Sequence, residues 1–457
     1  MNNLLLAFYG DDFTGSTDAM EALYKKGYRT VLYLTPPSKE ILEKNPELQC
    51  IGVAGTGRAK DNQGLEKEIK PIMQNLSNSG ARIVHYKTCS TFDSSPEIGS
   101  IGCAIKTALP YFDKQNHVPV IVGAPPLGRY TYFGHHFAKS GDKVYRLDRH
   151  PIMSVHPSTP MNESDLGLHL GKQLKGDYGY FDVLLNNKKN YKMNYFSVAS
   201  TSSVVIHDII DNEMLCRSAD IIWNYREGKT TFVVGSSGVE YGLTDYWSHE
   251  ANILPNGNME YDHKAKEQIL VISGSASDVT RQQILDAGNK DYHLIRIPNE
   301  IIMGLEMKSF IEEILVLIKK GDSIVLYTAL GPEDENITVL KNFFKNKSMS
   351  DAQTAEHIGN YLGILTKEIL DHSKLDRLVV AGGDTSGFVA KALGIDSLEV
   401  IQSISPGAPL CIGKSFQNNS SSIEIALKGG QFGQIDYFDR VKQSTNRKGT
   451  IQICNQK

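Results

Sequence analysis

Short apolar runs alternate with stretches of helical periodicity along this 457-residue chain. Residues 4–9 form a run of large apolar side chains, and residues 14–26 then carry apolar residues at helical spacing. Strand-length runs separated by helical segments are typical of βαβ units, whose strands lie parallel in a sheet covered by helices. In the first unit, Thr14 or Ser16 is the expected N-cap of the helix, and Gly27 is the expected residue after its end.

The alternation occurs in both halves of the chain. It weakens between residues 248 and 266, a polar stretch that contains Pro-Asn-Gly, and it restarts near residue 267. The helix with the clearest periodicity is predicted over residues 351–371, and a shorter one over 388–393. Strands are predicted at residues 4–9, 30–34, 50–54, 82–86, 118–122, 204–207 and 231–234, and then at 268–273, 323–328, 377–381, 398–404 and 423–427.

The polar stretch predicts a domain boundary. We expect domains at residues 1–247 and 267–457, joined by a linker at 248–266, each with a mainly parallel sheet flanked by helices. The predicted class is α/β, with the active site in the cleft between the two domains. The alternative for residues 248–266 is a long surface loop inside one domain.

Composition excludes several classes of protein. The formal net charge is −4, and Lys and Arg are scattered along the chain, which argues against a nucleic-acid partner. No uninterrupted apolar run approaches the roughly 18 residues of a membrane helix, and the first residues lack the basic start of a signal peptide. The six cysteines are widely spaced without Cys-x-x-Cys, so neither a zinc cage nor a disulfide scaffold is indicated. We therefore expect a cytoplasmic protein without a membrane partner.

The first candidate site is the sequence GDDFTGS, directly after the first predicted strand. Ligands of open α/β sheets bind at the carboxyl ends of strands, where Asp11 and Asp12 fall. Two adjacent carboxylates there can bind hydroxyl groups, hold a metal ion or accept a proton. The structural alternative is that one of them only caps the following helix.

The second candidate site follows the strand at 82–86. Lys87, Ser90 and Asp93 share one connecting segment, and Arg58 follows the third strand. Cations for a carboxylate and hydroxyl donors for sugar oxygens suit a polyhydroxy acid. A solvated polar loop with a helix cap is the alternative. Cys89 has no readable histidine partner and is interpreted as a packing residue.

Three glycine-bearing turns follow predicted strands in the C-terminal half. They are GSAS at 274–277, GGDTSG at 382–387 and KGGQFG at 428–433. Glycine lets the backbone approach a phosphate, and a helix N-terminus offers free N–H groups. The P-loop spacing, G-x-G-x-x-G and H-E-x-x-H are all absent. His135 and His136 lie in a Gly- and Tyr-rich stretch that is interpreted as a structural loop.

At these motifs the chain resembles the four-carbon acid sugar kinase family over nearly its whole length. The resemblance implies an N-terminal domain that binds a sugar acid and a C-terminal domain that binds ATP. It implies phosphorylation of a terminal hydroxyl of threonate, erythronate or a 3-oxo-tetronate. The motifs occur in the family's order: DDFTG, YKTCSTFDSSPEIGSIG, HPSTPM, GSAS, GGDTSG, PGAPL and KGGQFG.

The resemblance also implies site residues. For the substrate these are Asp11, Asp12, Arg58, Lys87, Ser90 and Asp93, and for ATP they are Ser275, Gly382, Gly383, Asp384, Thr385 and Gly430.

The implied reaction is in-line transfer from ATP to a primary alcohol, with Mg²⁺ offsetting phosphate charge. Asp12 is the expected base, Lys87 and Arg58 orient the substrate carboxylate, and domain closure excludes water.

Departures from the family pattern leave the exact substrate open. GGDTSG stands where members often have GGETSG, so the carboxylate of Asp384 is one methylene shorter. Residues 146–150 and the stretch GAPPLGRYTYFGHHF differ from tetronate kinases, which makes a 3-oxo-isoapionate-type acid an alternative. The expected partners are an acid sugar, ATP and, as an option, a second copy in a homodimer. Rival functions are a metal-dependent hydrolase or lyase using Asp11 and Asp12, and a non-catalytic sugar-acid sensor.

Overall fold

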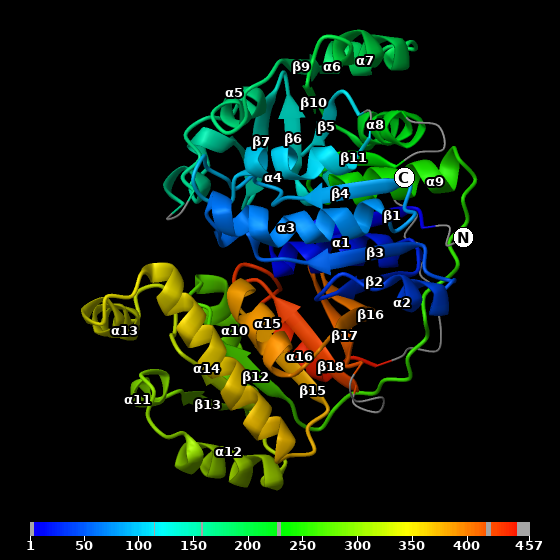
Figure 1. Cartoon of the computed structure of the whole chain (residues 1–457). Helices are drawn as coiled ribbons and strands as arrows, with labels where there is room; N and C mark the ends of the chain where they lie inside the picture. Colours follow the sequence, from blue (N-terminus) through cyan, green and yellow to red (C-terminus); the bar gives the residue numbers. More distant parts are fainter. Residues whose placement is uncertain (1–3, 114, 157–158, 226–229, 417–421, 446–457) are drawn as a thin grey trace. The chain divides into compact units, whose positions relative to one another are not determined.

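The computed structural model describes residues 4–113, 115–156, 159–225, 230–416 and 422–445 (Figure 1). The chain divides into two compact units. The first is Met1–Asn258 together with Asp396–Leu398, and the second is Met259–Ile395 together with Glu399–Lys457. The division falls inside the stretch predicted as a linker.

The N-terminal unit is built on a parallel sheet. All its neighbouring strands run in the same direction, so each strand returns through a crossover connection. One short segment joins from far along the chain, because Ser397 and Leu398 pair antiparallel with Tyr33 and Leu32. In spatial order the strands are β2 (Thr30–Tyr33), β3 (Cys50–Ala54), β1 (Leu6–Gly10), β4 (Ile83–Lys87), β11 (Thr231–Gly235), β5 (Val118–Ile121), β10 (Val204–His207) and β9 (Tyr178–Phe181).

Helices supply the crossover connections of this unit. Most begin with an aspartate or serine whose side chain accepts a hydrogen bond from a backbone N–H of the first turn, which is the usual N-cap chemistry. The helices are α1 (Phe13–Lys25), α2 (Lys39–Lys44), α3 (Asn62–Ser77), α4 (Ile101–Ala108), α5 (Leu166–Gly171), α6 (Val183–Asn186), α7 (Tyr191–Ala199), α8 (Asn212–Asn224) and α9 (Gly238–His249).

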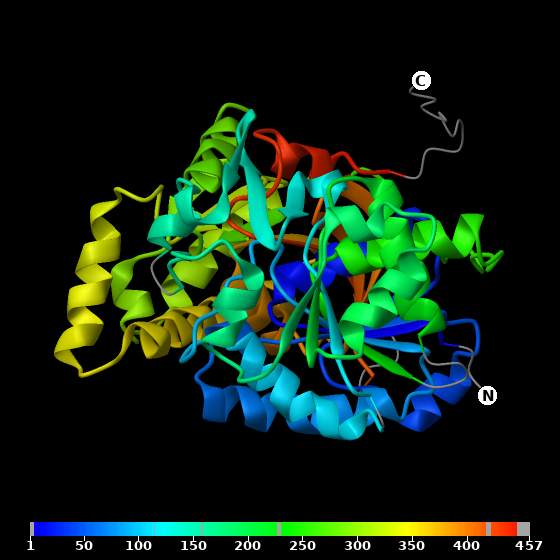
Figure 2. The same ribbon diagram turned by 90° about the horizontal axis from the view of Figure 1, so that it is seen from above.

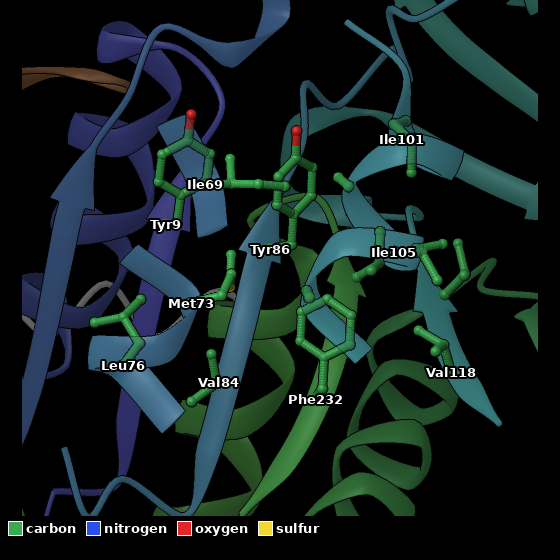
Figure 3. Packing of buried hydrophobic residues seen from close by; sticks show 14 of the residues in the cluster. Tyr9, Ile69, Met73, Leu76, Val84, Tyr86, Ile101, Ile105, Val118 and Phe232 are labelled. Atoms are coloured by element: carbon green, nitrogen blue, oxygen red, sulfur yellow. The ribbon is translucent and has the colours of Figure 1, made fainter. Parts of the chain in front are cut away.

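The two faces of β4 show how side-chain alternation divides the core. Val84 and Tyr86 point to the face covered by α3 and α4, where they pack with apolar side chains of both helices (Figure 3). His85 points to the other face and meets Glu240 of α9 through Nδ1 and Oε1 at 2.7 Å, both side chains being fully buried. Figure 2 shows α3 and α4 on one side of the strands and α8 and α9 on the other.

A separate three-stranded sheet interrupts the βα alternation. It consists of β6 (Arg129–Tyr132), β7 (His135–Ser140) and β8 (Lys143–Arg146), which pair antiparallel in that order. The prediction that His135 and His136 lie in a loop is therefore wrong. The strands are short, and glycines at positive φ separate them, which hides their alternation in the sequence.

Most strands of the C-terminal unit are parallel to their neighbours. β12, β13, β14, β15 and β18 pair in parallel, and β17 pairs antiparallel with β18. In spatial order the strands are β13 (His293–Arg296), β14 (Ile324–Tyr327), β12 (Leu270–Ser273), β15 (Arg377–Ala381), β18 (Ser422–Lys428), β17 (Ala408–Lys414) and β16 (Ser397–Ser405). The helices are α10 (Asp278–Gly288), α11 (Asn299–Ile302), α12 (Lys308–Lys320), α13 (Glu335–Asn346), α14 (Asp351–Asp371), α15 (Gly383–Ala392) and α16 (Tyr437–Lys442).

Two glycines bring α14 and α15 together (Figure 1). A Cβ at Gly359 would lie 2.1 Å from Cδ2 of Phe388, and one at Gly363 would lie 2.8 Å from the Cβ of Ala392. Real Cβ atoms do not approach so closely, so the glycine spacing of one helical turn sets this packing. The contact holds α15, which carries the glycine turn at 382–387, against the longest helix of the unit.

The predicted α/β class with mainly parallel strands in both units is confirmed, and most predicted strands and the helix at 351–371 occur within two residues of their expected ends. Gly27 follows the end of α1 with φ +82°, as predicted. The N-cap of α1 is Asp12, so the expectation of Thr14 or Ser16 is wrong. The helix predicted at 388–393 begins earlier, at Gly383, because Gly382 at φ +134° lets the strand turn directly into a helix.

None of the helices among the described residues is long and apolar enough to cross a bilayer. Cys50, Cys89, Cys103 and Cys216 are free thiols.

Arg377 is expected to carry an unusual share of the C-terminal unit's stability. It is fully buried, donates from Nε to Glu424 Oε2 at 2.5 Å, and donates to the carbonyls of Lys264 at 2.8 Å and Val441 at 2.7 Å. Arg377→Met leaves these carbonyls without this donor and leaves Glu424 with Lys266, whose Nζ lies 3.2 Å from Oε1. Urea unfolding should show a loss of about 3–5 kcal/mol.

The matched control is Arg440→Met. Its exposed i,i+4 pair with Asp436 is expected to contribute less than about 1 kcal/mol. Equal losses in the two variants would contradict the role given to Arg377.

Candidate functional site

The first cluster of predicted residues lies at the carboxyl edge of the N-terminal sheet. Gly10, the last residue of β1, is in register with Ala54 of β3 and Lys87 of β4. The chain leaves β1 towards β2 and β3 on one side and later adds β4 on the other, so β1 lies where the strand order reverses. Ligands of open α/β sheets bind at such switch points.

Asp12 is the more accessible carboxylate of the pair, with 14% of its side chain exposed. Its Oδ1 accepts the N–H of Gly15 at 2.9 Å, and its Oδ2 lies 3.1 Å from Nη2 of Arg58. Asp12 therefore caps α1, as expected from the alternative in which one aspartate caps the helix. It also forms an ion pair at the end of the strand. The two roles use different oxygens and are compatible.

Asp11 has the opposite environment. It is 1% exposed, and within the described residues neither carboxylate oxygen has a hydrogen-bond partner. Burial, followed by the charge of Asp12, raises the pKa of Asp11 to about 7, against the opposing effect of Arg58 and Lys87. A carboxylate that is buried without donors is costly, so Asp11 is a site of stored electrostatic strain.

Lys87 brings a buried ammonium group to the same place. Only 3% of it is exposed, and a Cβ at Gly15 would lie 2.2 Å from its Nζ. Burial lowers the pKa of Lys87, but the carboxylates of Asp12, Asp18 and Asp11 outweigh it, so the pKa lies above its usual value. Asp18 was missed by sequence reasoning. The available signal was a carboxylate in α1 directly before the apolar residues Ala19 and Met20.

The segment after β4 is held in a strained conformation. Phe92 is fully buried with φ +57°, a value that large side chains rarely adopt. Thr91 Oγ1 donates to Asp93 Oδ1 at 2.7 Å, and Ser94 Oγ contacts Nε2 of His169 at 2.9 Å. Strain of this kind persists where the surroundings over-determine the backbone, often at functional sites.

Ser90 connects the cluster to the three-stranded sheet. Arg129 Nε donates to Ser90 Oγ at 3.3 Å, and His136 Nε2 lies 2.9 Å from the Ser90 carbonyl oxygen. Burial lowers the pKa of His136 to about 4, so this imidazole is neutral near pH 7. Arg129 and His136 were not among the predicted site residues, although both stand in GRYTYFGHHF.

The predicted substrate residues thus form one cluster. Arg58, Lys87 and Asp93 all act on the pKa of Asp11, and Ser90 joins through Arg129. In HPSTPM, Pro157 and Ser158 lie outside the described residues. Within the ranges that the structure describes, no group of three or more His, Cys, Asp or Glu side chains is arranged to hold a metal ion.

The second cluster lies at the carboxyl edge of the C-terminal sheet. Ser273 of β12 and Lys428 of β18 are both in register with Ala381 of β15, so the three glycine turns leave adjacent strands. A Cβ at Gly274 would lie 2.2 Å from Oγ1 of Thr385, and one at Gly430 would lie 2.6 Å from Oγ of Ser275. The turns therefore approach one another closely only because they carry glycine.

The C-terminal cluster exposes polar groups that suit phosphate. Gly382 is the N-cap residue of α15 without a side-chain hydrogen bond, so no side chain at this cap competes for the first N–H groups. Thr385 is buried, whereas Asp384 in the first turn is exposed. Free N–H groups at a helix N-terminus that follows a glycine turn form an anion-binding arrangement.

Lys428 begins the predicted turn KGGQFG, but sequence reasoning assigned it no role. It is fully buried, and its Nζ donates to Thr280 Oγ1 at 2.9 Å and to the Gly430 carbonyl at 3.4 Å. Neither partner is charged, and burial lowers the pKa of Lys428 to about 7. The signal was a lysine at the end of an apolar strand, immediately before Gly429 and Gly430.

Comparisons with known proteins divide the chain in the same way. A family model described as a sugar-binding N-terminal domain matches residues 6–243. A model described as a nucleotide-binding C-terminal domain matches residues 270–438.

Curated relatives match over almost the whole chain. A 3-oxo-isoapionate kinase of Paraburkholderia graminis is 38% identical over 446 residues, covering 96% of this chain and 94% of that protein. A 3-oxo-tetronate kinase of Pseudomonas savastanoi pv. phaseolicola is 27% identical over 443 residues, covering 95% and 96%.

Two solved structures share the fold. One from Salmonella typhimurium LT2, described as a putative tRNA synthase, has a TM-score of 0.76 at 21% identity and covers 96% of this chain and 99% of its own. A Haemophilus influenzae protein has a TM-score of 0.71 at 22% identity, covering 95% and 99%.

Asp11→Asn is expected to stabilise the protein in a pH-dependent way. Because the pKa of Asp11 is raised in the folded state, its ionisation costs stability fully above pH 7, and the cost disappears as pH falls towards 4. Urea unfolding should show a gain of roughly 2–4 kcal/mol at pH 8 and less than half of that at pH 5. Asp12→Asn, which loses an ion pair and a charged cap, should be destabilised at pH 8. A gain for Asp11→Asn that is independent of pH would contradict this account.

Proposed function

The chain belongs to the four-carbon acid sugar kinase family, and we propose that it is an ATP-dependent kinase acting on the terminal hydroxyl of a four-carbon or related branched acid sugar. The observation that carries the proposal is the N-terminal cluster. It combines carboxylates, cations and hydroxyls at the switch point of a domain that matches the sugar-binding family model. The glycine turns of the nucleotide-binding domain provide the complementary phosphate-type groups.

Two substrate classes are supported to different degrees. Identity to the 3-oxo-isoapionate kinase is 38%, compared with 27% for the 3-oxo-tetronate kinase at similar coverage. The higher identity favours a branched 3-oxo acid as the natural substrate. Threonate, erythronate and 3-oxo-tetronates are the second group to test.

We assign the proton-accepting role to Asp12. It is the accessible member of the aspartate pair, whereas both oxygens of Asp11 are buried. Arg58 and Lys87 supply positive charge that favours an anionic substrate, and Asp93 and Ser90 offer groups for its hydroxyls. Phosphoryl transfer depends mainly on positioning and charge stabilisation, so no covalent enzyme intermediate is required.

The C-terminal cluster would hold the phosphates of ATP. Backbone N–H groups of Gly383 and Asp384, the hydroxyls of Thr385 and Ser275, and the close approach allowed at Gly430 suit this role. Mg²⁺ on a nucleotide needs only one or two carboxylates in addition to phosphate oxygens, and the exposed Asp384 fits that requirement. When bound, Mg²⁺ would offset phosphate charge.

The rival functions make different predictions. A metal-dependent hydrolase or lyase would act without nucleotide, whereas the C-terminal domain of this chain matches a nucleotide-binding family model. A sensor would bind the acid without producing ADP, whereas the curated relatives that span the chain are kinases. The cytosolic location and the homodimer stay predictions.

The direct test is ADP release in a coupled assay against a panel of four- and five-carbon sugar acids. We expect turnover with at least one 3-oxo or hydroxy acid and a phosphate on its terminal carbon, located by NMR. Turnover without nucleotide, or none with any acid, would overturn the proposed function.

Asp12→Asn is expected to lower kcat by about 10²–10⁴-fold, the usual contribution of a general base. The KM for ATP should stay within threefold, because the change is confined to the N-terminal cluster. Asp11→Asn is the neighbouring comparison and should retain more activity than Asp12→Asn. The reverse order of the two variants would move the role of base to Asp11.

Lys428 is expected to take up a proton when ATP binds. Its pKa near 7 reflects burial without a charged partner, and nearby phosphate charge raises that pKa towards its ordinary value. Titration calorimetry at pH 7.5 in buffers of different ionisation enthalpy should detect this uptake, which should vanish below about pH 6.

Lys428→Met should abolish the uptake and weaken ATP binding about tenfold. Lys391→Met, which removes an exposed lysine of α15, is the control and should behave like the wild type. Unchanged uptake in Lys428→Met would place the nucleotide phosphates away from this lysine.

A further inference from the structure

Three cations reach the N-terminal cluster, and their partners differ. Arg58 is paired with Asp12 at 3.1 Å. Lys87 is fully buried among the carboxylates of Asp12, Asp18 and Asp11. Both charges are thus compensated by the protein itself before any substrate arrives.

Arg129 is the third cation and lacks such compensation. Its Nη1 donates to the carbonyls of Leu127 at 2.9 Å and Lys139 at 3.3 Å, and its Nε donates to Ser90 Oγ at 3.3 Å. All of these partners are neutral. Among the residues that the structure describes, no carboxylate forms an ion pair with Arg129, and its Nη2 makes no hydrogen bond there.

The environment of this guanidinium disfavours its charge. Burial lowers the pKa of Arg129, and the carboxylates of Asp18 and Asp93 act on it only as more distant charges. A partly buried cation without an anionic partner is costly, and a bound anion removes that cost. Within the described residues, the two N–H groups of Nη2 are the donors of Arg129 that remain for a bound carboxylate, and a hydrogen bond to a charged acceptor is stronger than one to a neutral carbonyl.

We propose that Arg129 binds the carboxylate of the acid sugar and thereby selects an acid over the corresponding uncharged sugar. This assignment rests on the proposed kinase function. It gives the substrate carboxylate to Arg129, and leaves Arg58 and Lys87 as compensation for the aspartate pair and as general positive charge. Arg129 begins β6, so the three-stranded sheet is the element that sets substrate specificity.

The contacts that hold β6 in place support a positioning role for the three-stranded sheet. Arg129 forms a β-bridge to Ala124, and Thr131 forms one to Ile209, which ties β6 to the main body of the unit. His136 of the neighbouring strand holds the Ser90 carbonyl through Nε2 and meets Thr131 Oγ1 through Nδ1 at 3.1 Å. These β-bridges and hydrogen bonds fix the position of β6 and therefore of the Arg129 backbone. Selective binding of a carboxylate requires a binding group that is held in place in this way.

The experiment compares one turned-over acid with its carboxamide in wild type, Arg129→Gln, Arg129→Lys and Arg82→Gln. Arg82 is the matched control. It is also partly buried and donates to a backbone carbonyl, that of Trp223 at 3.0 Å, but it lies at the opposite end of β4.

In Arg129→Gln the KM for the acid should rise about 10–100-fold, whereas kcat/KM for the carboxamide should change less than threefold. Arg129→Lys should fall between wild type and Arg129→Gln, and Arg82→Gln should match the wild type for both compounds. The KM for ATP should be unchanged throughout. Thermal melting identifies any misfolded variant. If Arg129→Gln does not fold, the acid and the carboxamide are compared in wild type and Arg129→Lys instead.

An acid KM within threefold of wild type in Arg129→Gln, or equal losses for acid and carboxamide, would overturn the proposal. Failure of the kinase function is distinguishable, because the wild type would then release no ADP with any acid. In that case calorimetric binding of the same acids to wild type and Arg129→Gln still decides whether Arg129 holds a carboxylate. Binding weakened at least tenfold by the substitution supports it, and unchanged binding overturns it.

Discussion

The N-terminal unit is organised around two adjacent carboxylates at the end of a buried parallel strand. Asp11 and Asp12 repel each other, and burial makes their charges costly. The fold compensates them with the start of α1, Arg58 and Lys87. Gly15 is a consequence of this packing, because any side chain there would occupy the space of the Lys87 ammonium and the Asp12 carboxylate. The order of residues in GDDFTG therefore follows from the need to compensate charge at a switch point.

The C-terminal unit meets its own constraint in a different way. Its three turns approach one another through glycine, and its buried cation, Lys428, has only neutral partners. The N-terminal cluster compensates its charges except that of Arg129, which suits a small substrate with one carboxylate and several hydroxyls. A cluster with an uncompensated cation and free N–H groups suits a highly charged anion such as a triphosphate. The contrast between the two clusters therefore matches a sugar-binding and a nucleotide-binding domain.

Sequence reasoning predicted the elements whose signal is local. The buried parallel strands are continuous apolar runs, so β3, β10 and β15 were predicted to the residue, and the motifs at their ends predicted the positions of both clusters. It missed what depends on distant contacts. β6 to β8 are short, and only pairing across the sheet reveals them. Arg129 and Lys428 stand out because their hydrogen-bond partners in the folded structure are neutral. No local sequence pattern indicates which partners a buried cation will have. Asp12 rather than Thr14 caps α1 because the strand end already places its carboxylate there.

The cost of Asp11 is the strongest indication that this edge of the sheet is functional. A buried carboxylate without donors lowers stability, and the strained Phe92 adds to the cost in the neighbouring segment. A chain selected for stability alone would replace Asp11 by a neutral residue of similar shape. Asp11 adds negative charge beside the accessible Asp12. This charge favours proton acceptance by the pair, and it also attracts the side chains of Arg58 and Lys87. On this account, the chain gives up stability at Asp11 and keeps Arg58 and Lys87 paired with the two aspartates. The cation that we propose for the substrate carboxylate is then Arg129, whose hydrogen-bond partners within the described residues are all neutral.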